Sequence, residues 1–150
     1  MRKNGFSLVE LLIVVGVILI VAAIAIPNLM KSRAAANESS AVASLHSLLT
    51  AKINFATACP DTGFTATLTD LGSGTTCPAG NKQIDPQLET GTKAGYSFAA
   101  ATSGGTPATG FSITADPSST ASGRRHFYMN ETGAIRYNNS TTATSTDNAL

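Results

Sequence analysis

The chain has 150 residues, of which 13% are charged and 6% aromatic, and it contains no tryptophan. Its formal net charge is +1 at pH 7, so nucleic acid is a partner that the charge allows but does not indicate. Alanine, serine, threonine and glycine dominate the second half, which favours an exported domain over a cytosolic enzyme. Beyond a hydrophobic N-terminal segment, enough chain remains for one small core.

The most hydrophobic part of the chain spans residues 6–30. Residues 11–26 contain no charged or strongly polar side chain, and with its flanks the run reaches the ~20 residues that a helix needs to cross a bilayer. Glu10 is the exception, since an acidic side chain at membrane depth costs about 2–3 kcal/mol. Arg2 and Lys3 precede the run, so the positive-inside rule predicts that the remainder of the chain lies outside the cytoplasm.

A glycine stands directly before this run, in the order Gly5-Phe6-Ser7-Leu8-Val9-Glu10. With the apolar helix that follows, residues 1–33 resemble the class III signal of type IV prepilins and of type II secretion pseudopilins. The resemblance implies that residues 1–5 are a leader peptide, that a prepilin peptidase cuts between Gly5 and Phe6, and that the new Phe6 amine is methylated. A secretory signal cut near residues 22–25 and a plain membrane anchor are alternatives, but neither requires Glu10 or a glycine before phenylalanine.

Cleavage after Gly5 would place a free amine one helical turn from the Glu10 carboxylate. A paired carboxylate is tolerated in an apolar core, whereas a lone one is costly. We therefore expect Glu10 of one subunit to neutralise the Phe6 amine of the same or a neighbouring subunit. Gly16 and Pro27 mark where the helix can most easily loosen or bend.

Helical spacing continues beyond the membrane run, which we place at residues 6–30. The pattern predicts one long bent helix from Ser7 to about Thr57, ended by Pro60. Its second half is amphipathic and belongs to a globular domain of residues 31–138. The expected apolar face contains Val42, Leu45, Leu49, Ile53 and Ala56, with Leu48 and Phe55 alongside, and the other faces contain Glu38, Ser40, Ser44, Ser47 and Lys52.

The chain has two cysteines, Cys59 and Cys77, in the part expected outside the cytoplasm, where oxidation is favoured. We expect a disulfide between them, which would contribute about 3 kcal/mol by closing a loop rich in Gly and Thr. A zinc site is a poor alternative, because two isolated cysteines supply too few ligands.

Beyond Gly95 the hydrophobic period changes from helical to two. Alternation near residues 96–101, 111–116, 126–129 and 135–137 predicts a four-stranded antiparallel meander, with a glycine-containing turn before the last strand. The expected fold is α+β, with the amphipathic half of the helix packed on this sheet, which also resembles the ladle shape of pilins. Residues 139–150 are polar and are predicted to form a flexible tail.

The sequence contains no motif of a hydrolase, metalloprotease or phosphate-binding loop. His46 and His126 are expected to be exposed structural residues. Arg124, Arg125 and His126 form a small basic cluster that could contact phosphate or an acidic neighbour, although a solvated strand start is the simpler interpretation. We expect no catalytic residue, metal or cofactor.

The residues and the resemblance together predict a structural subunit of a type IV pilus. It would assemble with copies of itself into a helical filament, moving from an inner-membrane pool to an extracellular fibre. Its other partners would be the prepilin peptidase that also acts as N-methyltransferase, and the pilus or secretion machinery of the inner membrane. The resemblance implies adhesion, twitching motility or DNA uptake as functions of the filament, without choosing among them. A periplasmic pseudopilin of a type II secretion system and a membrane-anchored minor pilin with a ligand site remain alternatives.

Overall fold

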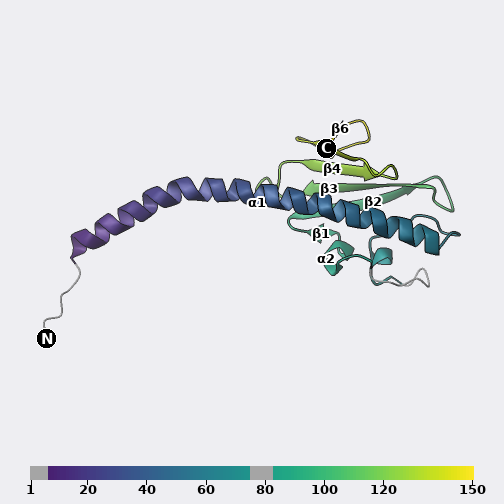
Figure 1. Cartoon of the computed structure of the whole chain (residues 1–150), viewed down its shortest axis with the longest axis horizontal. Coiled ribbons are helices and arrows are strands. Elements are labelled where there is room, and N and C mark those ends of the chain that lie inside the picture. The colour runs from purple at the N-terminus through teal and green to yellow at the C-terminus, as the bar shows by residue number, and fades with distance from the viewer. Residues whose placement is uncertain (1–6, 75–82) are drawn as a thin grey trace.

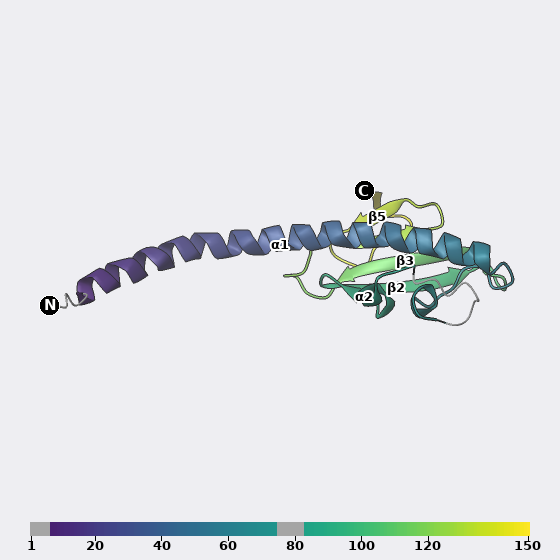
Figure 2. The ribbon, with the colours of Figure 1, turned by 60° about the horizontal axis from the view of Figure 1, so that its bottom comes forward.

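The computed structural model describes residues 7–74 and 83–150. One long helix, α1 (Leu8–Ala58), packs its C-terminal half on an antiparallel sheet, while its N-terminal half projects away from the domain (Figure 1). Figure 2 shows the same helix lying across one face of the sheet. The predicted α+β fold, a long N-terminal helix on an antiparallel meander, is confirmed, although the sheet has six strands and not four.

Helix α1 continues through Pro27 without interruption. At 1.5 Å per residue it is about 75 Å long, and its N-terminal half bows gently away from the line of the C-terminal half (Figures 1 and 2). The helix ends at Ala58, where the N–H of Cys59 donates to the carbonyl of Phe55. The specific roles of Gly16 and Pro27 in bending the helix stay predictions.

The buried stripe of α1 differs from the predicted apolar face. Ile53 is 49% exposed, whereas Glu38 and Lys52, which were expected on polar faces, are buried. This expectation was wrong because both charged side chains find partners in loops that fold back onto the helix. Ser44, also expected on a polar face, is buried as well. The stripe recurs at intervals of three and four residues, as one face of a helix requires. Its buried residues are Glu38, Ala41, Ser44, Leu45, Leu48, Ala51, Lys52 and Phe55.

The sheet has the order β1-β2-β3-β4-β5-β6, with each strand antiparallel to the next. Alternate side chains of the central strands face α1 and are buried, among them Phe98, Ile113 and Met129. The four predicted strands correspond to β2–β5, whereas β1 and β6 are too short to show a period. The strands are β1 (Thr92–Lys93), β2 (Tyr96–Ser103), β3 (Gly110–Pro117), β4 (His126–Asn130), β5 (Ile135–Asn138) and β6 (Asn148–Ala149).

The connection between α1 and the sheet contains two short helices, η1 (Thr69–Leu71) and α2 (Pro86–Glu89). Asp85 caps α2, because its carboxylate accepts a hydrogen bond from the N–H of Gln87 at 2.8 Å. Leu71 and Leu88 from these helices enter the same core as α1 and the strands.

The C-terminal segment differs from the flexible tail that its polar composition predicted. β6 pairs with β5, and Ala143 is only 2% exposed. The Asp147 carboxylate accepts hydrogen bonds from the Thr144 N–H at 2.7 Å and from the Asn138 side chain at 3.0 Å. These contacts give residues 139–150 a defined course against the sheet.

Candidate functional site

Residues 8–30 of α1 form an exposed apolar surface, which we call the apolar stem. Every valine, isoleucine, leucine and methionine in it is exposed, from 46% at Val15 to 77% at Leu8. Among the described residues, α1 is the one helix whose length and composition suit a membrane crossing. A continuous apolar surface of this size needs a cover, either lipid or other protein.

Glu10 lies in the first turn of α1, beside the apolar stem. Its Oε2 accepts a hydrogen bond from the Ser7 N–H at 2.9 Å, so the carboxylate folds back toward the N-terminal end of the helix. A negative charge there is favourable, because the first N–H groups of a helix lack partners and carry the positive end of its dipole. The spacing Ser7-x-x-Glu10 matches a capping box. From the sequence, Glu10 was assigned only a pairing role, and this capping signal was missed. Gly5 and Phe6 lie outside the described residues.

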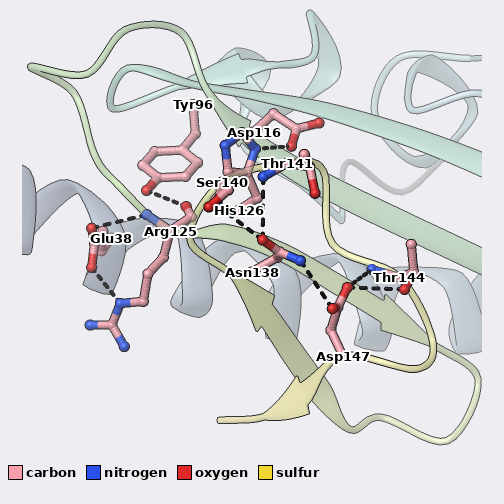
Figure 3. A network of polar contacts seen from close by, with 10 residues as sticks. All are labelled: Glu38, Tyr96, Asp116, Arg125, His126, Asn138, Ser140, Thr141, Thr144 and Asp147. Carbon is pink, nitrogen blue, oxygen red and sulfur yellow. Dashed lines mark hydrogen bonds and ion pairs between the residues drawn. The ribbon is translucent and has the colours of Figure 1, made fainter.

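A second polar cluster joins α1 to the loop of residues 118–125 (Figure 3). Glu38 accepts hydrogen bonds from the backbone N–H groups of Arg124 and Arg125, at 2.9 and 3.3 Å, and from Nε of Arg125 at 2.8 Å. Burial opposes its ionisation, but these hydrogen bonds outweigh burial and lower the pKa of Glu38. Tyr96 fastens the other side of the loop by donating to the Arg125 carbonyl at 2.9 Å. The helix and the loop are thereby held as one unit.

The predicted basic cluster is divided by this arrangement. Arg125 is engaged by Glu38 and lies 5.7 Å from the Tyr137 ring centroid, whereas the side chain of Arg124 is exposed. His126 was expected to be exposed, but it is half-buried, and its Nδ1 lies 2.5 Å from Oδ1 of Asp116. Asp116 could not be recognised as its partner from the sequence, because the pair depends on how β3 and β4 are aligned.

Lys52 is the second charged residue of the buried stripe. Its Nζ donates to the Thr65 carbonyl and lies 5.6 Å from the Phe111 ring centroid. Burial lowers the pKa of Lys52 to about 8, and the negative charge of Asp70 only partly opposes this effect. The ammonium group ties the end of α1 to the loop that follows it.

An open groove of about 710 Å³ lies beside the loop of residues 118–125. It is lined mainly by hydroxyl and amide side chains together with Arg124 and His126. Within residues 7–74 and 83–150, no three His, Cys, Asp or Glu side chains come together as a metal site would require. His46 is exposed on α1, and His126 is held by Asp116, so the two histidines are not brought together.

Cys59 is disulfide-bonded. Its expected partner, Cys77, lies outside the described residues, so the pairing of Cys59 with Cys77 stays a prediction. Cys59 directly follows α1 and packs against the core.

Comparison with known proteins bears on the stem in particular. Residues 1–26 match a family model described as the prokaryotic N-terminal methylation motif. The chain is 50% identical over 54 residues to the type IV major pilin protein PilA of Myxococcus xanthus (strain DK1622). This match covers 36% of the chain and 24% of that protein. No solved structure matches the chain.

The apolar stem thus begins in a match to a methylation motif and continues into a helix packed on an antiparallel sheet. The two matches confirm the resemblance to the type IV pilin family that Gly5, Phe6 and Glu10 predicted.

Proposed function

We propose that this chain is the structural subunit of a type IV pilus, with no catalytic role. After cleavage between Gly5 and Phe6 and methylation of the Phe6 amine, it assembles with copies of itself through the apolar stem. The observation that carries the proposal is that stem, which is exposed on every side yet continuous with the helix of a folded domain. The methylation motif and the identity to PilA support the same function.

During assembly, the stem would exchange contacts with lipid for contacts with other subunits. In the membrane, lipid chains contact residues 8–30, and in the filament the stems of neighbouring subunits take their place. A carboxylate in that core costs several kcal/mol unless it is paired. The Phe6 amine that cleavage would create is basic and can supply the opposite charge. Pairing of Glu10 with this amine would make the core tolerable and set the axial register of each new subunit.

The test is Glu10→Ala, with Glu131→Ala as a control that removes a carboxylate from the exposed turn between β4 and β5. Both variants should be processed, folded and present in the membrane. Glu10→Ala should lower the rate of fibre formation more than tenfold, because a pairing energy of about 2 kcal/mol is lost. Shed fibres, quantified against the membrane pool, provide the measurement. Assembly of Glu10→Ala at the normal rate and yield would show that the pairing mechanism is wrong.

A pseudopilin of a type II secretion system has the same stem and remains the second candidate. Electron microscopy of cells that lack the protein, scored for surface fibres and for secreted enzymes, separates the two functions. Loss of fibres supports the pilus and an extracellular location, whereas loss of secretion with fibres intact supports the periplasmic pseudopilus. If fibres and secretion both persist, the minor pilin with a ligand site becomes the better candidate. Adhesion, twitching motility and DNA uptake are then scored in the same cells.

A further inference from the structure

A smaller groove, of about 330 Å³, lies where α1 leaves the apolar stem. The helix forms one wall and the loop of residues 118–125 forms the other, and Glu38 holds that loop in place. The groove combines apolar and cationic walls. Its lining consists of Met30, Lys31, Ala34, Ala35 and Glu38 from α1 and Thr120, Ala121 and Arg124 from the loop.

The charges of this groove are not balanced within the molecule. Glu38 is already satisfied by Arg125 and by two backbone N–H groups. In the part of the chain that the structure describes, neither Lys31 nor the Arg124 guanidinium has an acidic partner, and both side chains are exposed. Two cations, one from each wall, are therefore available to an anion in the groove.

The position of the groove relative to the bilayer indicates which anion it can bind. No charged residue lies between Glu10 and Lys31, and residues 11–30 in a helix span about 30 Å, which is the thickness of the hydrocarbon core of a bilayer. Lys31 therefore lies at the level of the headgroups when the stem crosses the membrane. The loop of residues 118–125 brings Arg124 to the same level.

We propose that this groove binds the phosphate of an anionic phospholipid, such as phosphatidylglycerol, in the leaflet from which the domain emerges. The phosphate lies between Lys31 and Arg124, and the glycerol and first methylene groups contact Met30 on the membrane side of the groove. The lipid thereby fixes the depth and the rotation of the domain on the membrane before assembly. The proposal rests on the proposed function only in that it requires the stem to cross a membrane.

The experiment uses the full-length protein in bicelles that contain equimolar phosphatidylglycerol and phosphatidylcholine. Native mass spectrometry after gentle release measures the ratio of the two lipids that remain bound. The wild type should retain phosphatidylglycerol in preference. Lys31→Gln and Arg124→Gln should each lower this preference about fivefold, as expected when one cation that contacts the phosphate directly is removed. Lys31→Arg should preserve it, because the charge is kept.

Arg33→Gln is the matched control, since Arg33 is a cation near the same depth that does not line the groove. The lipid preference of Arg33→Gln should stay within about twofold of the wild type, because Arg33 does not line the groove. A diffuse attraction to the anionic surface would instead lower the preference of Arg33→Gln and Lys31→Gln alike. Equal losses for Arg33→Gln and Lys31→Gln would overturn the proposal, as would an unselective wild type. Soluble glycerophosphate that competes as well as the lipid would assign the groove to free phosphate and would also overturn it.

The same samples distinguish failure of this proposal from failure of the proposed function. A protein that stays in the bicelle but shows no lipid preference contradicts the headgroup site alone. A protein that leaves the bilayer fraction contradicts both proposals, because the stem would then not be a membrane segment. Circular dichroism of each variant verifies that the helix and the sheet are intact.

Discussion

Lys52 illustrates how one residue can sit in a hydrophobic stripe and still be tolerated. The helical spacing of Leu45, Leu48 and Phe55 includes position 52, so its aliphatic stem packs among them. Its ammonium group reaches the Thr65 carbonyl, near the charge of Asp70. A buried cation of this kind stabilises the fold less than an apolar residue of similar size would, because it loses its hydration.

The lowered pKa of Lys52 predicts an unusual dependence of stability on pH. Between about pH 8 and the ordinary pKa of 10.5, the unfolded state holds a proton that the folded state releases, so stability rises with pH. From pH 7.5 to 10, the free energy of unfolding of the wild type should increase by about 2 kcal/mol relative to Lys52→Met. Urea unfolding of the detergent-solubilised protein measures both curves.

The control for this prediction is Lys93→Met, which removes a lysine from the edge strand β1, where it pairs with Asp85. Its stability should follow the wild type across the same pH range. Parallel curves for the wild type and Lys52→Met would show that Lys52 keeps its proton in the folded state.

At the scale of elements, the contact between α1 and the loop of residues 118–125 is the main polar joint of the domain. Asn37 donates to the Ser122 carbonyl at 2.9 Å, and Glu38 accepts from Arg124 and Arg125. Gly123 completes the joint, because a Cβ at this position would lie 2.1 Å from the Tyr96 hydroxyl. Helix, loop and strand β2 are thus fitted to one another at the point where the stem enters the domain.

Glu38→Ala should release this joint. It removes hydrogen bonds from three donors to one carboxylate and is expected to cost about 2 kcal/mol. Hydrogen exchange followed by mass spectrometry should show faster exchange in residues 118–125, with β2 and β3 little changed. The pKa of Glu38 is lowered in the folded state, so its contribution is present above its ordinary pKa and is lost as the pH falls below it.

Glu38→Gln separates charge from shape in the same joint. It preserves the side-chain volume but should remove this part of the acid dependence, because nothing at position 38 then titrates. Unchanged exchange of residues 118–125 in Glu38→Ala would mean that Tyr96 and Asn37 hold the loop without the carboxylate.

At the scale of the whole molecule, an apolar helix and a folded domain share one uninterrupted α1. A rigid connection means that packing of the stems in a filament would determine how the domains are arranged on its surface. In the proposed filament, the stem would be the assembly element, and the domain would supply the outer surface of the fibre.

Under the proposed function, cleavage after Gly5 and methylation of the Phe6 amine would prepare the whole molecule for assembly. We expect the membrane form to begin at Phe6 with a methylated amine, and Gly5→Val should block the cut, because the peptidase must fit closely around the chain at that position. Intact-protein mass spectrometry of the membrane fraction tests both statements. Val9→Ala, a change of similar size that leaves Gly5 and Phe6 intact, should be processed normally. A mature N-terminus beyond Ala22 would instead indicate an ordinary secretory signal.

The sequence alone predicted the features that depend on neighbours along the chain. The length of the apolar run, the single acidic residue in it and the glycine before Phe6 are all local, as is the alternation that marks β2–β5. The match of residues 1–26 to the methylation motif confirms the predicted resemblance, and the antiparallel sheet confirms the predicted fold. Cleavage after Gly5, the membrane crossing and the pairing of Glu10 stay predictions. Such features can be predicted because a long apolar run and a half-buried strand are each defined by the period and length of their own residues.

Only the tertiary structure decided which charged residues are buried and which of them meet. Glu38 and Arg125, Asp116 and His126, and Lys31 and Arg124 come from different segments of the chain. The sequence did not predict β1 or β6, because two residues are too few to show the alternation of a strand. Each takes its extended conformation from pairing with the neighbouring strand. The physical reason is the same throughout: the rotation of α1 and the register of the strands are set by packing of the whole core, and these determine which distant side chains face each other.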